Sequence, residues 1–227
     1  MNQELEDYIK AHIDAEPPHL YHLDRDTHLK LLYSRMCSGH LQGRLLKMLV
    51  RMIGPSVVLE LGTFSGYSAQ CLAEGLLGDE GRVHTIEIED ELEDFLREHF
   101  ASSPWGDRIE LHVGDAAEIV PQLNLQYDLV FIDANKRHYA RYYELVMPYV
   151  KSGGFIVADN TLWDGKVVAE ARDKKLDLQT QGIVDFNDMV ARDERVEKVI
   201  VPLRDGLTTS TRSPNPQGNF SHVMRFL

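Results

Sequence analysis

The fold is decided by residues 57–68, which read VVLELGTFSGYS. The first five are apolar apart from Glu60, and so short an apolar run predicts a buried strand. Gly62 and Gly66 follow, and glycines there let the backbone turn and come close to a ligand. A helix is predicted from about residue 66 to residue 76. The stretch therefore predicts a strand, a turn and a helix in succession.

The same rhythm continues along the chain. Further strands are predicted at residues 83–87, 109–113, 128–132 and 154–158, with helices at 90–100, 115–123 and 138–150 between them. Apolar strands that alternate with helices predict a parallel sheet covered on both faces. Right-handed crossovers then give a doubly wound, Rossmann-like α/β fold. After Asn160 we expect an irregular segment, a helix at 183–191 and strands at 196–201 and 207–211.

The 227 residues predict a single domain with three parts. Residues 1–55 form a helical N-terminal cap, with apolar stripes at residues 5–13 and 41–53, and Pro17 and Pro18 end the first helix. Residues 56–212 form the Rossmann-like core. Residues 213–227 form a C-terminal tail, a loop with a possible edge strand at 223–227.

Composition restricts the class of partner. The chain has 24 basic and 36 acidic residues, a formal charge of −12, which argues against a protein that binds nucleic acid through its phosphates. Its two cysteines, Cys37 and Cys71, suggest a reducing compartment. The acidic start lacks the features of a signal peptide, and no apolar run reaches ~18 residues. We expect a cytoplasmic protein with no nucleic-acid or membrane partner.

Acidic side chains occupy the predicted strand ends, where open α/β sheets bind ligands. Glu60, Glu87, Asp133 and Asp159 lie there, and any one could instead be a helix cap or a solvated turn residue. The turn after Glu60 lacks both the G-x-G-x-x-G pattern and the lysine of a phosphate-binding loop. Its acid would repel a pyrophosphate but suits the sulfonium cofactor S-adenosylmethionine. Glu87 would accept hydrogen bonds from the ribose hydroxyls.

A second group of polar residues predicts a metal site. Asp133 ends one strand, and Asp159 and Asn160 end the neighbouring strand, so three oxygen ligands of the kind that suits Mg²⁺ or Ca²⁺ would meet. The alternative is a helix cap beside an ordinary turn. Lys136 is either a solvated surface charge or, beside a cation, an amine whose lowered pKa suits a general base. Four N-terminal histidines lack zinc-ligand spacing: His12, His19, His22 and His28.

Together, several motifs of the chain resemble the cation-dependent O-methyltransferases, a group that includes caffeoyl-CoA and catechol O-methyltransferases and many bacterial relatives. The resemblance covers residues 38–211 and implies a class I methyltransferase fold, with a seven-stranded sheet whose last strand is reversed, and usually a homodimer. The motifs that carry it are VLELG at 58–62, GYS at 66–68, TIE at 85–87, GDA at 114–116, DANK at 133–136 and DNTLW at 159–163.

The resemblance also implies roles for individual residues. Asp133, Asp159 and Asn160 match the metal ligands, and Lys136 matches the lysine proposed as the base in the catechol enzymes. The positions that match contacts to the cofactor are Ser38, Glu60, Gly62, Ser68, Glu87, Asp115, Ala116 and Asp133. Asn135 and Asp164 depart from the plant enzymes' pattern, so those enzymes' substrate contacts do not transfer to this chain.

These inferences predict methyl transfer from S-adenosylmethionine to one hydroxyl of a vicinal aromatic diol, free or as a CoA ester. The divalent cation would be Mg²⁺, with Ca²⁺ or Mn²⁺ as alternatives. Trp163 could stack on the acceptor ring or belong to the core, and Arg204 could contact CoA phosphates or be a surface charge. Two other functions stay open: a nicotinamide-dependent oxidoreductase, and a cofactor-binding protein without catalytic activity.

Overall fold

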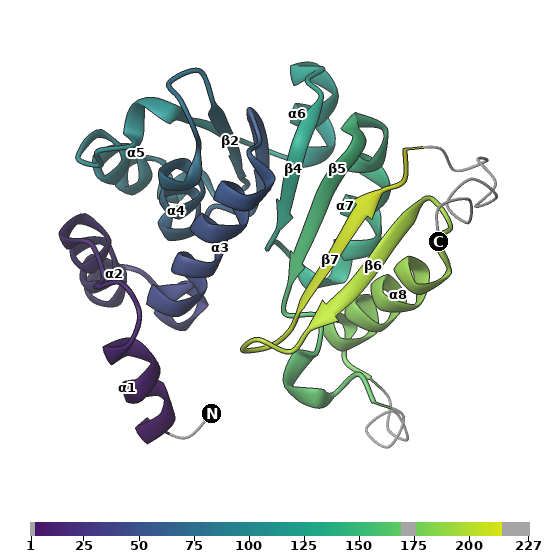
Figure 1. Cartoon of the computed structure of the whole chain (residues 1–227), viewed down its shortest axis with the longest axis horizontal. Coiled ribbons are helices and arrows are strands. Elements are labelled where there is room, and N and C mark those ends of the chain that lie inside the picture. Colours follow the sequence, from purple (N-terminus) through teal and green to yellow (C-terminus); the bar gives the residue numbers. More distant parts are fainter. Residues whose placement is uncertain (1–2, 169–175, 215–227) are drawn as a thin grey trace, which may run out of the picture.

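The computed structural model of the protein describes residues 3–168 and 176–214. Within them one seven-stranded sheet has the order β3-β2-β1-β4-β5-β7-β6 (Figure 1). The first five strands are parallel to one another, and β7 runs antiparallel to both β5 and β6. The strands are β1 (Val57–Leu61), β2 (Arg82–Glu87), β3 (Ile109–Val113), β4 (Tyr127–Ile132), β5 (Val150–Asp159), β6 (Val196–Val201) and β7 (Leu207–Arg212).

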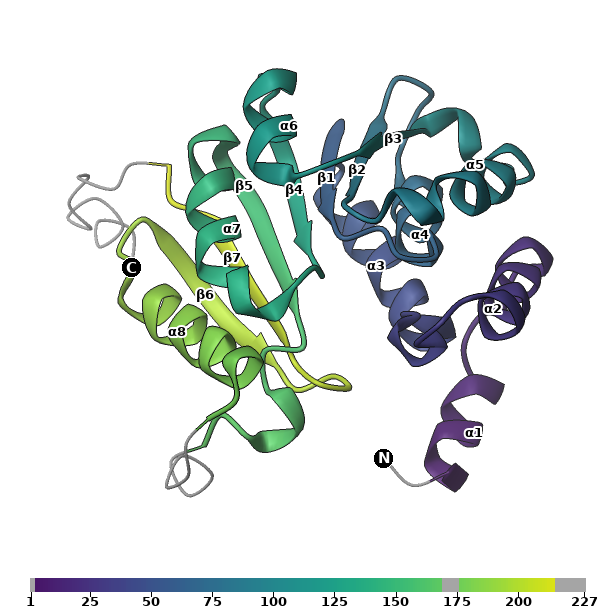
Figure 2. The same ribbon diagram turned by 180° about the vertical axis from the view of Figure 1, so that it is seen from behind.

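Helices cover both faces of this sheet, as the alternation of strands and helices predicts. α3 and α4 lie in front of it in Figure 1, and α6, α7 and α8 lie in front in the reverse view of Figure 2. α1 and α2 lie beyond α3 and α4, at the edge of the molecule. The helices are α1 (Gln3–Ala11), α2 (Pro18–Lys30), α3 (Gly39–Ile53), α4 (Tyr67–Gly75), α5 (Glu93–Ala101), α6 (Ala116–Leu123), α7 (Tyr139–Val146) and α8 (Leu178–Arg192).

Consecutive residues of the central strands serve opposite layers of the core. Leu59 in β1 and Val130 in β4 pack with α6, α7 and α8, whereas their neighbours Val58 and Leu129 pack with α3 and α4. This follows from the two-residue repeat of a strand, which turns successive side chains to opposite faces. A sheet covered on both sides therefore needs apolar residues at nearly every position, which is why its strands read as continuous apolar runs.

Three elements differ from the sequence-based expectation, each for a local reason. Pro18 does not only end the first helical pattern: it is the first residue of α2, a position where its missing N–H costs nothing. α8 begins five residues before the predicted start because the Asp177 side chain accepts hydrogen bonds from the Gln179 and Thr180 N–H groups. β5 begins at Val150, where a helix was expected to end, because α7 stops at Val146 and passes into a 3₁₀ turn.

Two further expectations concern the ends of the molecule and its surroundings. Most of the predicted tail, with its possible edge strand at 223–227, lies outside the described residues. In the ranges that are described, no helix combines the length and the apolar character that crossing a bilayer requires.

Cys37 and Cys71 are both free and buried, and burial raises the pKa of Cys37 to about 11.

The amino ends of three parallel strands are joined by one carboxylate. Asp128, near the start of β4, accepts hydrogen bonds at Oδ2 from the Ser56 N–H at 3.0 Å and the Val57 N–H at 2.9 Å. Its Oδ1 binds the Lys151 ammonium of β5 at 2.7 Å. Asp128 therefore connects β1, β4 and β5 at their amino ends, opposite to the strand carboxyl ends.

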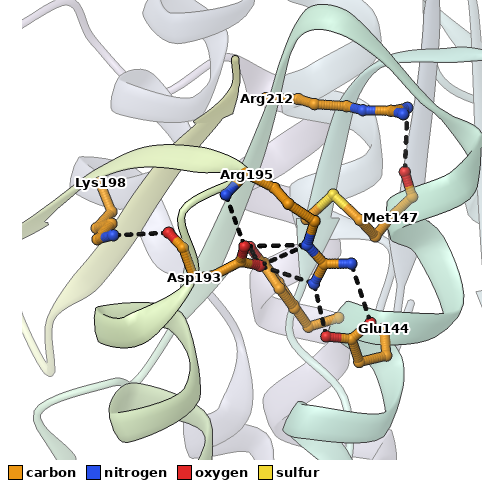
Figure 3. A network of polar contacts seen from close by, with 7 residues as sticks. Glu144, Met147, Asp193, Arg195, Lys198 and Arg212 are labelled. Atoms are coloured by element: carbon orange, nitrogen blue, oxygen red, sulfur yellow. Dashed lines mark hydrogen bonds and ion pairs between the residues drawn. The ribbon is translucent and has the colours of Figure 1, made fainter. Parts of the chain in front are cut away.

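A polar network fixes the α7–α8 layer to β6 (Figure 3). The Arg195 guanidinium lies between two carboxylates, with Nη2 at 2.7 Å from Asp193 Oδ2 and at 2.7 Å from Glu144 Oε1. Tyr143 of α7 donates to Asp193 Oδ2 at 2.9 Å. Burial alone would raise the pKa of Asp193, but the hydrogen bonds from Arg195 and Tyr143 outweigh it and lower that pKa.

We predict that Asp193→Asn lowers the free energy of unfolding at neutral pH by about 1–3 kcal/mol, because it removes the charge that pairs with Arg195. A carboxyl group whose pKa is lower in the folded state stabilises above its unfolded pKa, and this contribution disappears as pH falls through the folded pKa. The deficit of the variant should therefore shrink below about pH 4. Urea unfolding at several pH values measures it.

The exposed pair of Arg192 and Asp188, whose side chains approach only to 3.9 Å, supplies the matched control. Arg192→Gln should change the unfolding free energy by less than about 0.5 kcal/mol. An equal effect of both substitutions would contradict a specific role for Asp193.

Candidate active site

A cavity of about 780 Å³ lies at the carboxyl ends of the parallel strands. This is where an open doubly wound sheet binds its ligands. The cavity brings together residues from several strand ends and from the segment before β1. The predicted site residues that line it are Ser38, Gly62, Ser68, Glu87, Asp115, Ala116, Asp133, Lys136, Asp159 and Asn160.

Gly62 lets the turn after β1 lie directly against the turn after β4. Its φ of +92° is one that side-chain-bearing residues rarely adopt, and a Cβ at this position would lie 2.3 Å from the Asp133 carbonyl oxygen. The Asp133 N–H donates to the Leu61 carbonyl at 2.9 Å and joins the two turns, and the Gly62 N–H donates to the Ile86 carbonyl of β2 at 3.0 Å. No other residue fits there without moving one of the two turns.

Glu87 fixes this turn to the end of β2. Its Oε2 accepts hydrogen bonds from the N–H groups of Thr63 and Phe64, at 3.2 and 2.7 Å. Its Oε1 accepts from those of Ile88 and Glu89, at 2.9 and 3.0 Å. A carboxylate offers about four acceptor positions, so any ribose hydroxyl that binds Glu87 has to share them with the backbone.

Glu60 does not line the cavity, although the sequence predicts that its carboxylate faces the cofactor. It lies one residue before the end of β1 and is fully buried, on the same face of the sheet as Val58. Burial raises the pKa of Glu60 to about 8, although the hydroxyls of Ser68 and Thr85 oppose this rise. An acid inside a strand covered on both faces points into a helical layer and not over the strand end.

A chain of hydroxyl groups still connects Glu60 to the cavity turn. Thr85 donates to Glu60 Oε2 at 2.5 Å, and the Thr85 and Thr63 hydroxyl oxygens lie 2.6 Å apart. Thr63 is also bound through its backbone N–H to Glu87. Glu60 therefore supports the turn from beneath.

Asp133 and Asp159 follow residues that are paired in adjacent strands, Ile132 in β4 and Ala158 in β5. Asp159 is only 4% exposed, and burial followed by the charge of Asp133 raises its pKa to about 6. Asn160, the next residue, lines the same cavity with a φ of +58°. Two carboxylates and an amide oxygen form a donor set that fits a hard divalent cation, which would relieve the repulsion between the two acids.

Lys136 is held against Asp133 within the cavity wall. Its Nζ lies 2.5 Å from Asp133 Oδ1 and donates to the Tyr139 hydroxyl at 2.8 Å. The Lys136 side chain is 13% exposed, so the ammonium is fixed and not free in solvent. Gly182 of α8 permits this placement, because a Cβ there would lie 2.4 Å from the Lys136 carbonyl oxygen.

Gln42 contacts the candidate site, although no pattern in the sequence predicts it. This side chain of α3 is 2% exposed and donates from Nε2 to Asp159 Oδ2 at 2.6 Å. Arg204, between β6 and β7, donates to Gln42 Oε1 at 2.7 Å and also to the Ser38 carbonyl. The signal in the sequence is a polar residue on the apolar helical stripe of Leu46 and Val50. Its partner lies 117 positions away, and no local pattern identifies it.

Trp163 and Asn135, whose roles the sequence leaves open, both line the cavity. Trp163 lines the cavity and also packs against the core, and its Nε1 donates to Thr180 Oγ1 at 3.0 Å, so both readings of this residue have support. Asn135 lines the cavity as well, and its side chain accepts a hydrogen bond from the Arg137 N–H at 3.2 Å. It caps the short 3₁₀ turn that carries Lys136.

Comparison with solved structures identifies the same architecture in other proteins. The chain is similar to the O-methyltransferase TomG from Streptomyces achromogenes, solved in complex with SAM, with a TM-score of 0.84 and 28% identity over 94% of this chain and 99% of that one. It is also similar to an O-methyltransferase from Bacillus cereus, solved in complex with SAH, with a TM-score of 0.82 and 25% identity over 92% of this chain and 97% of that one.

Comparison of sequences agrees. The chain is 30% identical to caffeoyl-CoA O-methyltransferase 1 of Eucalyptus globulus over 196 residues, which cover 83% of this chain and 79% of that protein. A probable caffeoyl-CoA O-methyltransferase 2 of Dictyostelium discoideum is 30% identical over 192 residues, or 82% and 79% of the two chains. Residues 10–213 match the family described as O-methyltransferase, so the chain belongs to the O-methyltransferase family.

Proposed function

We propose that the protein transfers the methyl group of S-adenosylmethionine to one hydroxyl of a small aromatic vicinal diol, with the help of a divalent cation. The observation that carries this proposal is one cavity lined both by Glu87 and Asp115 and by Asp133, Asp159 and Asn160. The relatives from Streptomyces achromogenes and Bacillus cereus, solved with SAM and SAH, support the choice of cofactor.

The cofactor would occupy the side of the cavity formed by the ends of β1, β2 and β3. Gly62 and Ser68 would meet its methionine end, and Glu87 would meet the ribose. Asp115 and Ala116 begin α6 directly after β3 and would flank the adenine. Ser38 would close over the cofactor, with Asp133 beside it, and Glu60 would act through the turn that it supports.

The cation would be held by Asp133, Asp159 and Asn160. Mg²⁺ suits these oxygens best, and Ca²⁺ or Mn²⁺ would also fit. When bound, such an ion supplies Lewis-acid chemistry and lowers the pKa of a hydroxyl that approaches it. Gln42 would keep Asp159 in one orientation, because its N–H group binds Oδ2 and leaves the carboxylate little freedom to rotate.

Lys136 would act on the proton of the acceptor hydroxyl. The structure fixes its Nζ beside Asp133, so a neutral amine there would take this proton, and an ammonium would instead stabilise the phenolate. The phenolate oxygen would then form a bond to the methyl carbon as the bond from that carbon to sulfur breaks. Holding the two reactants in line can supply about 7–11 kcal/mol of the barrier reduction.

The acceptor could carry an anionic group such as a CoA ester. Arg35, Arg137 and Arg141 line the cavity with exposed side chains, whereas Arg204 is already bonded within the chain. The relative from Eucalyptus globulus is named a caffeoyl-CoA O-methyltransferase. The homodimer and the cytoplasmic location stay predictions.

The two alternative functions are less well supported. Nothing in the family membership favours a nicotinamide-dependent oxidoreductase, and the turn after β1 lacks that class's glycine pattern. A non-catalytic protein that binds the cofactor would bind S-adenosylmethionine but methylate no diol. Labelled methyl transfer to a panel of diols, with and without Mg²⁺, distinguishes this case from the proposed enzyme.

We predict that EDTA abolishes methyl transfer and that excess Mg²⁺ restores it. The reason is that the acceptor would bind to the cation held by Asp133 and Asp159, and not to these acids directly. Asp159→Ala should lower kcat/KM by about 100-fold or more, with S-adenosylmethionine binding largely retained. Asp188→Ala, which changes an exposed acid of α8, is the control and should be as active as the parent protein. Full activity in EDTA would exclude the metal role.

We predict that Lys136→Met lowers kcat by about 10²–10⁴-fold, because the phenolate then forms without a proton acceptor or a stabilising ammonium. Calorimetric titration with S-adenosylmethionine should show little change in Kd. Lys30→Met is the matched control, because Lys30 pairs with Asp26 at 2.7 Å on the exposed side of α2. Unchanged kcat in Lys136→Met would show that the lysine only neutralises Asp133.

A further inference from the structure

Two histidines and a glutamate meet between β2 and β3, away from the residues that line the cavity. His84 of β2 lies beside Glu110 of β3 in the parallel register, and His112 follows two residues later on the same face. Their ligand atoms all lie within 4.8 Å of one another. These three residues lie on two strands and form no local spacing pattern, so the sequence alone does not indicate the group.

Two of the distances between these atoms are close to those in a tetrahedral zinc centre. His84 Nδ1 lies 3.2 Å from His112 Nε2 and 3.4 Å from Glu110 Oε2. With zinc bonds of about 2.0–2.2 Å, two ligands at the tetrahedral angle are about 3.3–3.5 Å apart. An ion could therefore enter among the three side chains with small movements. Two imidazoles and one carboxylate are also a ligand set that zinc uses when it keeps a fourth position open.

The protonation state and the surroundings favour a cation. Burial lowers the pKa of His84 and of His112, so that both rings are neutral and able to bind a metal at neutral pH. Arg82 adds to the lowering at His84, but its guanidinium is held by the carbonyls of Asp79 and Gly81. The Glu110 side chain is 49% exposed, which gives an ion access from solvent.

We propose that His84, Glu110 and His112 form a second metal site, specific for borderline divalent cations of the zinc class and separate from the predicted oxygen-ligand site. Nitrogen ligands suit zinc, cobalt and nickel and are poor ligands for Mg²⁺. A bound ion would connect β2 to β3, the edge strand of the sheet. Both strands lead within three residues to cavity residues, Glu87 and Asp115. Without the ion, His84 and His112 share a hydrogen bond, and Glu110 lies beside His84.

The test is titration of the full chain with Co²⁺ in excess Mg²⁺, which occupies the oxygen-ligand site. We expect one equivalent of Co²⁺ to give the visible absorption of a tetrahedral centre, and Zn²⁺ to displace it. Zinc should also raise the Tm. His112→Gln and Glu110→Gln should each weaken zinc binding about tenfold or more and remove the increase in Tm. His28→Gln, which changes an exposed histidine of α2, should behave as the parent protein.

Two results would overturn the proposal. One is the absence of tetrahedral absorption in the parent protein, which would leave a hydrogen-bonded pair of histidines beside Glu110. The other is unchanged zinc affinity in both variants, which would assign the ion to other histidines. Glu110 is exposed, so Glu110→Gln gives an answer even if His112→Gln does not fold. Neither variant changes a residue of the proposed catalytic cavity, so methyl transfer in Mg²⁺ alone serves as the check of folding.

Discussion

The contact between the backbones of Gly62 and Asp133 is the constraint on which the site depends. The turns after β1 and β4 approach until no Cβ fits between them, and this closeness sets the positions of the groups that follow. On one side Lys136 follows Asp133 by three residues, and on the other the turn bound to Glu87 follows Gly62. A wider separation of the two turns would move the predicted cation ligands away from the predicted cofactor groups.

The acids that line the cavity and the one beneath it differ in their burial. Glu60 is fully enclosed, and its pKa near 8 means that it carries little charge at neutral pH. Asp133 keeps a lysine within 2.5 Å, and Asp159 has the side-chain amide of Gln42. The formal charge of the sequence counts these acids equally, but the structure separates a neutral structural acid from two carboxylates that a cation could join.

Much of the fold was predictable because its strands are short apolar runs whose pattern depends on local sequence alone. The positions of Asp133 and Asp159 at adjacent strand ends followed from that topology. The depth of Glu60 did not follow, although the predicted and observed strands both end at Leu61, because the burial of a residue within a strand depends on the helices that pack on that face of the sheet. The bond from Gln42 to Asp159 and the meeting of His84 with His112 depend on contacts between distant segments, which no pattern in a single segment contains.

Asp128 lies at the amino ends of the central strands. Its bonds to Ser56, Val57 and Lys151 involve none of the residues that line the cavity. The anchoring of the strands and the proposed site are thus placed at opposite ends of the same strands. Substitutions that reshape the cavity leave the contacts of this anchor intact. Such a division lets one scaffold diverge toward new substrates without first losing its ability to fold.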